Sequence, residues 1–119
     1  MARVVAFIPD LLFGSRVHGA LRAAGHEVEL VADASNVGDM LAGADVLVFD
    51  LTDEVPGRIG TFETLRGGIE RVRALAFYSH VEADTRMLAE AAGFDLVVPR
   101  SRMAREAATL IDRLVGSGQ

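Results

Sequence analysis

The sequence predicts a doubly wound α/β fold in which a five-stranded parallel sheet, in the order 2-1-3-4-5, lies between two layers of helices. Five short apolar runs alternate along the chain with segments of helical periodicity, and four of these runs are nearly continuous in apolar residues. Continuous runs are typical of parallel strands that helices cover on both faces. Because crossovers between parallel strands are almost always right-handed, this alternation leaves few other topologies.

The expected strands cover residues 3–8, 27–31, 45–49, 73–78 and 95–98. The second run differs from the others because its residues alternate, with Val28 and Leu30 apolar and Glu27 and Glu29 charged. Alternation indicates a strand with one solvated face. We therefore expect this strand at an edge of the sheet.

Apolar residues spaced three and four apart indicate amphipathic helices between the strands. The clearest stripes contain Phe13, Val17, Ala20, Leu21 and Ala24 in the first helical segment, Ile59, Phe62, Leu65, Ile69 and Val72 in the third, and Met103, Ala107, Leu110, Ile111 and Leu114 in the last. Gly25, Gly43, Gly93 and Gly116 each follow a helical pattern, as expected of residues that end helices. The pair Gly67-Gly68 interrupts the third stripe, so that helix is either broken there or close to another backbone.

The composition fits one domain. The chain has 119 residues, of which 50% are hydrophobic, and this is enough for one ordinary core. We expect a single domain over residues 1–115 and a flexible tail over residues 116–119. No apolar run approaches the ~20 residues of a membrane span, and the N-terminus lacks the basic and apolar regions of a signal peptide. These features predict a cytoplasmic protein that does not contact a membrane.

Charge and cysteine content narrow the possible functions. The formal net charge is -5 and the pI is about 5.1, which argues against a nucleic-acid partner because phosphate binding needs a basic surface. The absence of cysteine removes disulfides, thiol nucleophiles and thiolate metal sites. All twelve basic residues are arginines, which a biased composition is enough to explain.

Four polar side chains follow four different apolar runs, at the point where each expected strand ends. They are Asp10, Asp50, Ser79 and Arg100. The carboxyl ends of parallel strands meet at one edge of a sheet, so these side chains are expected to form one site. Two carboxylates could hold a hard divalent cation such as Mg²⁺, and Asp50 could accept a phosphoryl group whose oxygens Ser79 and Arg100 would bind.

This arrangement resembles the receiver domain of response regulators, the CheY-like family, over the whole chain. The segment Asp45-Val46-Leu47-Val48-Phe49-Asp50 stands where that family carries its phospho-acceptor aspartate at the end of the third strand. Asp10 matches the acidic position after the first strand, Ser79 the Ser or Thr after the fourth, and Arg100 the lysine after the fifth. The resemblance implies a flavodoxin-like three-layer sandwich, a Mg²⁺ site at Asp10 and Asp50, and a kinase or output protein as partner.

Several residues depart from the receiver pattern. Pro9 stands where receivers usually carry a first acidic residue, and Arg100 replaces the lysine. Lost charge lowers metal affinity, and a planar guanidinium does not substitute freely for an ammonium. Val97 stands roughly at the place of the family's aromatic switch residue. The chain is therefore more similar to small stand-alone receiver-like proteins, and we expect weak Mg²⁺ binding, no organic cofactor and a degenerate pseudo-receiver.

Each site residue also has a structural interpretation. Asp10 could cap a helix, Asp50 could form an Asx turn as the chain leaves the strand, and Ser79 could be a strand-end hydroxyl with ordinary hydrogen bonds. Arg100 could hold Asp50 in a permanent salt bridge. Because the strand ends supply no other cation, we expect Arg100 within hydrogen-bonding distance of Asp50. Of the histidines, His80, next to Ser79, is the best placed to face the site, but a solvated loop imidazole is the simpler interpretation.

Two other functional classes stay open. One is a flavodoxin-like domain that binds a small ligand at the same edge, although Leu12 stands where a cobalamin-binding motif would need histidine, and no phosphate-binding glycine loop is present. The other is an assembly protein without chemistry, for which Met87, Ala91 and Ala92 offer a small apolar surface that could form a homodimer. We do not expect an independent enzyme, because no base and nucleophile pair is visible outside the phospho-acceptor set.

Overall fold

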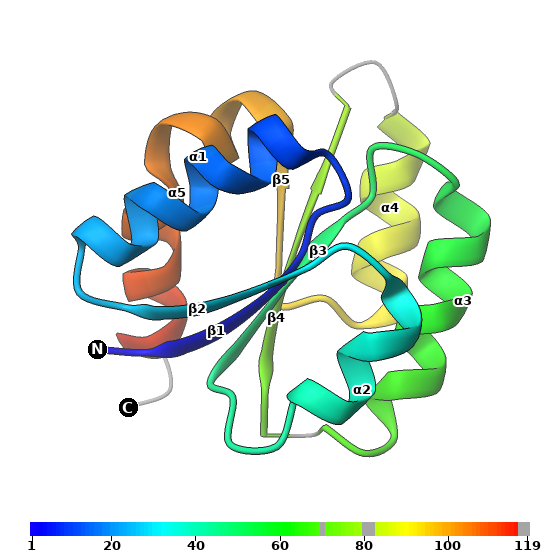
Figure 1. Cartoon of the computed structure of the whole chain (residues 1–119). Coiled ribbons are helices and arrows are strands. Elements are labelled where there is room, and N and C mark those ends of the chain that lie inside the picture. Colours follow the sequence, from blue (N-terminus) through cyan, green and yellow to red (C-terminus); the bar gives the residue numbers. More distant parts are fainter. Residues whose placement is uncertain (70, 80–82, 117–119) are drawn as a thin grey trace.

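The computed structural model describes residues 1–69, 71–79 and 83–116, with only the backbone of Ala83 described. Five parallel strands form one sheet in the order β2-β1-β3-β4-β5, as predicted from the sequence (Figure 1). The strands are β1 (Arg3–Phe7), β2 (Glu27–Val31), β3 (Val46–Asp50), β4 (Arg73–Tyr78) and β5 (Leu96–Pro99). β2 lies at an edge and its exposure alternates along the strand, which confirms the prediction from its sequence.

Helices follow each strand and cover both faces of the sheet (Figure 1). They are α1 (Leu11–Ala23), η1 (Ala34–Asn36), α2 (Val37–Met40), α3 (Val55–Arg66), α4 (Ala83–Ala92) and α5 (Arg100–Gly116). α1 and α5 pack together on one face, and α2, α3 and α4 lie on the other. The backbone of α5 departs from helical geometry at Glu106. Gly116 belongs to α5, so only residues 117–119 of the expected tail lie outside the described part of the chain.

Two separate apolar clusters form the core, one on each face of the sheet. The cluster under α1 and α5 contains the whole predicted stripe of α5, from Met103 to Leu114. The opposite cluster contains Phe49, Phe62 and Phe94, with the rings of Phe62 and Phe94 stacked 3.7 Å apart. Because both faces are covered, the strands β1, β3 and β4 are almost entirely buried.

The second and third crossovers differ from the helices that the sequence predicts. The second crossover contains only the short η1 and one turn of α2. α3 ends at Arg66 with Gly67 as its C-cap, so Ile69 and Val72 are not part of the helix as the predicted stripe assumed. Both residues still pack against the core cluster on that face. The glycine pair therefore ends the helix, because two glycines raise the conformational cost of continuing it.

A buried histidine joins the start of the sheet to the last helix. The backbone N–H of Ala2 donates a hydrogen bond to His26 Nδ1 at 2.9 Å, and His26 Nε2 lies 2.9 Å from Asp112 Oδ1. Because Nδ1 accepts the bond from Ala2, Nε2 carries the ring proton in neutral His26 and donates it to Asp112. One imidazole thus connects the residue before β1, the residue before β2 and helix α5. This contact lies at the amino edge of the sheet, opposite the carboxyl ends of the strands.

Candidate functional site

The carboxyl ends of the five strands form the edge that the sequence singles out. Asp50 is the last residue of β3, Ser79 directly follows β4, and Arg100 directly follows β5. Asp10 lies three residues beyond the end of β1, immediately before α1. The parallel topology thus brings four segments that are distant in the sequence to one edge of the sheet.

Asp50 turns back onto the chain that follows it. Its Oδ1 accepts hydrogen bonds from the backbone N–H of Thr52 at 2.7 Å and from Thr52 Oγ1 at 2.6 Å. This is the Asx turn that the sequence left open as an alternative for Asp50. The Asp50 side chain is only 5% exposed, so its carboxylate has exchanged water for these protein donors.

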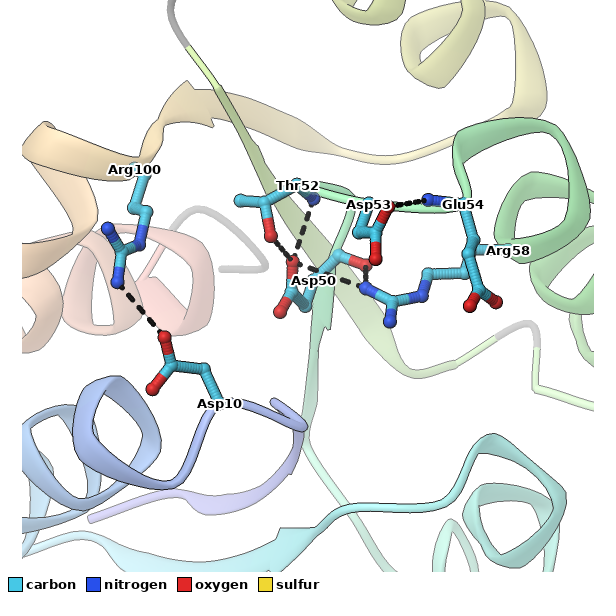
Figure 2. Close-up of polar contacts among 7 residues, drawn as sticks. All are labelled: Asp10, Asp50, Thr52, Asp53, Glu54, Arg58 and Arg100. Carbon is cyan, nitrogen blue, oxygen red and sulfur yellow. Dashed lines mark hydrogen bonds and ion pairs between the residues drawn. The ribbon is translucent and has the colours of Figure 1, made fainter.

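An arginine of α3, Arg58, contacts the Asp50 carboxylate. Its Nη1 lies 3.5 Å from Asp50 Oδ1 and donates a hydrogen bond to the backbone oxygen of Asp50 at 3.2 Å (Figure 2). The guanidinium carbon also lies 5.1 Å from the centre of the Phe7 ring. The Arg58 side chain is 13% exposed, so this is a largely buried ion pair with an aromatic neighbour.

Local structure explains why Arg58 reaches Asp50. α3 begins at Val55 with Pro56 in its first turn, where a missing N–H costs nothing. Side chains of a helix tilt toward its N-terminus, so a long side chain at position 58 extends back toward the strand end. A cation near a helix N-terminus is opposed by the helix dipole. The Asp50 carboxylate compensates that unfavourable position of Arg58.

The predicted pair between Arg100 and Asp50 is wrong. Arg100 Nη2 instead lies 3.4 Å from Asp10 Oδ2, and its guanidinium carbon lies 4.3 Å from the centre of the Phe13 ring. Both Arg100 and Asp50 are described, and no ion pair joins them (Figure 2). The prediction assumed that only the strand ends supply a cation, whereas the nearer one comes from α3. The available signal in the sequence was a basic residue eight positions after Asp50.

Asp10 caps α1, as the structural interpretation of this residue predicted, and also pairs with Arg100. Its Oδ1 accepts the backbone N–H of Phe13 at 3.0 Å and so caps α1, while its Oδ2 faces Arg100. The pair with Arg100 is about half exposed on both sides, 48% and 51%. Solvent screens such a pair, so the Arg100 guanidinium is held less firmly than that of Arg58.

Ser79 is partly buried at the end of β4, next to the end of β5. Its position agrees with the predicted site, and its proposed contact with a phosphoryl group stays a prediction. His80, the histidine considered for this site, lies outside the described residues.

The two candidate Mg²⁺ ligands, Asp10 and Asp50, do not form a preorganised metal site, because oxygens of both carboxylates are already in contact with protein groups. Asp10 uses one oxygen for the helix cap and turns the other to Arg100, and Asp50 Oδ1 is engaged by Thr52 and Arg58. Within residues 1–69, 71–79 and 83–116, no three His, Cys, Asp or Glu side chains gather as metal ligands would. A cation bound to either oxygen of Asp10 or to Asp50 Oδ1 would compete with these protein contacts.

The apolar surface considered for a homodimer is exposed on α4. Met87 is 70% exposed, and its neighbour Leu88 is 51% exposed. Ala91 is also exposed, whereas Ala92 packs against the core. The homodimer itself stays a prediction.

The sequence matches no family model and no curated protein. The fold is similar to solved response regulators: the receiver domain of Francisella response regulator 1452 has a TM-score of 0.86 at 12% identity, with both chains covered completely. A response regulator from Thermotoga maritima has a TM-score of 0.86 at 13% identity, with 98% of each chain covered. HP1043, an orphan response regulator of H. pylori, has a TM-score of 0.80 at 13% identity, with 96% of each covered. No helix in the described part of the chain is long and apolar enough to cross a membrane. The similarity to these solved structures shows that the chain has the fold of response regulator receiver domains over its whole length.

Proposed function

We propose that this chain is a stand-alone pseudo-receiver, a cytoplasmic signalling protein that acts through protein partners and not through a phosphorylated Asp50. The observation that carries the proposal is the Arg58 guanidinium, which lies 3.5 Å from Asp50 Oδ1 in a largely buried position. A phospho-acceptor needs its carboxylate charge for attack and a cation to neutralise the incoming phosphoryl group. In this chain a fixed side chain already neutralises that carboxylate.

Three features support the same interpretation. Thr52 places two hydrogen bonds on the oxygen that faces Arg58, so that oxygen is a poor nucleophile. Pro9 supplies no carboxylate beside Asp10, and Asp10 itself is paired with Arg100. The acceptor residue has thus kept its place in the fold while its surroundings favour a permanent ion pair.

Solved structures of similar fold include both a receiver in an activated state and an orphan regulator. One solved structure of similar fold is described as a BeF₃-activated receiver domain, and another, HP1043, as an orphan response regulator. A receiver without phosphoryl chemistry can still present the surface of the fold to a kinase or an output protein. The state of this chain would then be set by its amount or by a bound partner.

The test is a titration of Mg²⁺, with and without beryllofluoride as a phosphoryl mimic, followed by the amide NMR signals of Asp50 and Thr52. At millimolar Mg²⁺ the wild type should bind neither Mg²⁺ nor beryllofluoride. In Arg58→Gln the site should gain Mg²⁺ binding, because the competing cation is removed while a neutral side chain of similar length remains.

Arg86→Gln is the matched control, since Arg86 is an exposed arginine on α4 that pairs with Glu90. This variant should behave like the wild type. The proposal fails if the wild type binds Mg²⁺ and beryllofluoride together, or if it takes up phosphate from a small phosphodonor and Asp50→Asn abolishes the uptake. In that case the chain is a phosphorylated receiver.

A further inference from the structure

A groove opens beside the acceptor site, between the end of β1, the segment after β2 and the start of α3. It has a volume of about 550 Å³ and is open to solvent. Its apolar lining residues include Phe7, Pro9, Ala32 and Ala34. The groove therefore offers apolar surface at the carboxyl edge, on the face of the sheet that carries α3.

The charged residues of the groove give it a net negative character. Asp33, Glu54 and Arg58 all line it, but the Arg58 charge is already balanced by Asp50. The backbone N–H and the hydroxyl of Ser35 both donate to Asp33 and lower the pKa of its carboxyl, so Asp33 stays ionised near neutral pH. Glu54 is exposed at the start of α3. Two uncompensated carboxylates thus accompany an apolar lining.

We propose that this groove binds a basic segment of a partner protein, with an arginine or lysine between Asp33 and Glu54 and an adjacent apolar side chain against Pro9, Ala32 and Ala34. Charge complementarity favours a cation at this groove. A site open to solvent cannot enclose most of the surface of a small ligand, whereas a protein segment gains contacts beyond the groove. A basic protein segment is therefore the occupant that fits.

Two residues connect this groove to the acceptor carboxylate. Phe7 lines the groove and lies under the Arg58 guanidinium, and Arg58 lines the groove and holds Asp50. A segment bound in the groove would therefore lie next to Arg58, the groove residue that holds Asp50. The identity of the occupant as a signalling partner rests on the proposed function, but the groove and its charge do not.

The experiment uses the full chain and three probes in amide NMR titrations: the capped peptide acetyl-Leu-Arg-Leu-Arg-Leu-amide, the same peptide with glutamate at both arginine positions, and N-acetylarginine amide. The basic peptide should shift the amide signals of Asp33, Ala34, Glu54 and Gly57, and its Kd should rise with salt. The acidic peptide should not bind there. N-acetylarginine amide should bind much more weakly than the basic peptide.

Glu54→Gln should raise the Kd of the basic peptide about two- to fivefold, as expected for one partly screened ion pair. Glu63→Gln makes the same charge change on an exposed position of α3 outside the groove, and it should leave the Kd unchanged. Both residues are exposed, so neither change should impair folding.

The inference is overturned if the basic peptide does not bind, if its shifts map to another face, or if Glu63→Gln weakens it as much as Glu54→Gln. Equal affinity for N-acetylarginine amide would overturn it in favour of a small organic cation. If the basic peptide does not bind the groove and the chain also binds neither Mg²⁺ nor beryllofluoride, the groove proposal fails but the proposed function stands. Peptide binding to a chain that also accepts Mg²⁺ and beryllofluoride would leave the groove standing and remove the pseudo-receiver.

Discussion

Arg58 holds both the side chain and the main chain of Asp50. Its Nη1 lies 3.5 Å from Asp50 Oδ1 and 3.2 Å from the Asp50 backbone oxygen. One guanidinium of α3 thus fixes the last residue of β3 and neutralises the carboxylate on which receiver chemistry would depend. The other guanidinium at this edge, that of Arg100, belongs to a different and more exposed pair with Asp10.

Arg58→Gln should lower the free energy of unfolding by about 1–3 kcal/mol, because a buried carboxylate loses its cation while the Thr52 hydrogen bonds remain. Urea denaturation measures the change. Arg58→Lys should lose less, since an ammonium keeps the charge but loses the planar contact with Phe7. Equal stability of all three proteins would show that the pair contributes nothing.

Thr52→Val should lower the free energy of unfolding by about 1–2 kcal/mol, because it removes the hydroxyl donor to Asp50 while keeping the shape of the side chain. Thr64→Val is the control. Thr64 is exposed on α3, its hydroxyl bonds only to the Gly60 carbonyl, and its replacement should change stability by less than about 0.5 kcal/mol. Similar losses for the two variants in urea denaturation would contradict a special role for Thr52.

Arg100→Lys should change the free energy of unfolding by no more than about 1 kcal/mol, because the pair with Asp10 is half exposed and screened. It should also leave Mg²⁺ and beryllofluoride binding unchanged, since Arg58 and not Arg100 neutralises Asp50. Thermal melting and the same metal titration check both points. Mg²⁺ binding that appears only in Arg100→Lys would assign control of the site to Arg100.

His26→Leu should lower the free energy of unfolding by about 1–3 kcal/mol, because it leaves the buried N–H of Ala2 without its acceptor and removes the link to Asp112. His18→Leu, a change of the same type at a partly buried position of α1, is the comparison. Urea denaturation of both variants should show the larger loss for His26. Amide signals at the carboxyl edge should not move in either protein.

The Asp33 carboxyl should titrate below its ordinary value of 3.8, because the backbone N–H and then the hydroxyl of Ser35 bond to its charged form. A depressed folded-state pKa means that this contribution to stability is present above the unfolded pKa and is lost as pH falls through the folded pKa. Ser35→Ala should bring the pKa part of the way back, since the backbone donor stays. A carboxyl ¹³C titration measures both; an unchanged pKa in Ser35→Ala would show that the hydroxyl bond is not formed.

The sequence predicted the strand order, the edge position of β2 and the buried stripe of α5, because continuous, alternating and helical apolar patterns each correspond to one kind of burial. It also placed Asp10, Asp50, Ser79 and Arg100 at the carboxyl edge, which follows from parallel topology alone. The apolar stripe continued through Ile69 and Val72, but the Gly67-Gly68 pair indicated a possible break, and α3 does end at Arg66.

Tertiary structure decided which cation meets which carboxylate. Topology places residues at an edge, but the partner of a carboxylate depends on the direction and reach of long side chains from neighbouring elements. Arg58 extends back from the first turn of α3 over Phe7 to Asp50, and Arg100 lies over Phe13 and meets Asp10. The groove beside Phe7 likewise arises where three segments that are distant in the sequence come together. Periodicity carries no signal for such contacts, because it records how far each residue is buried and not which side chain it touches.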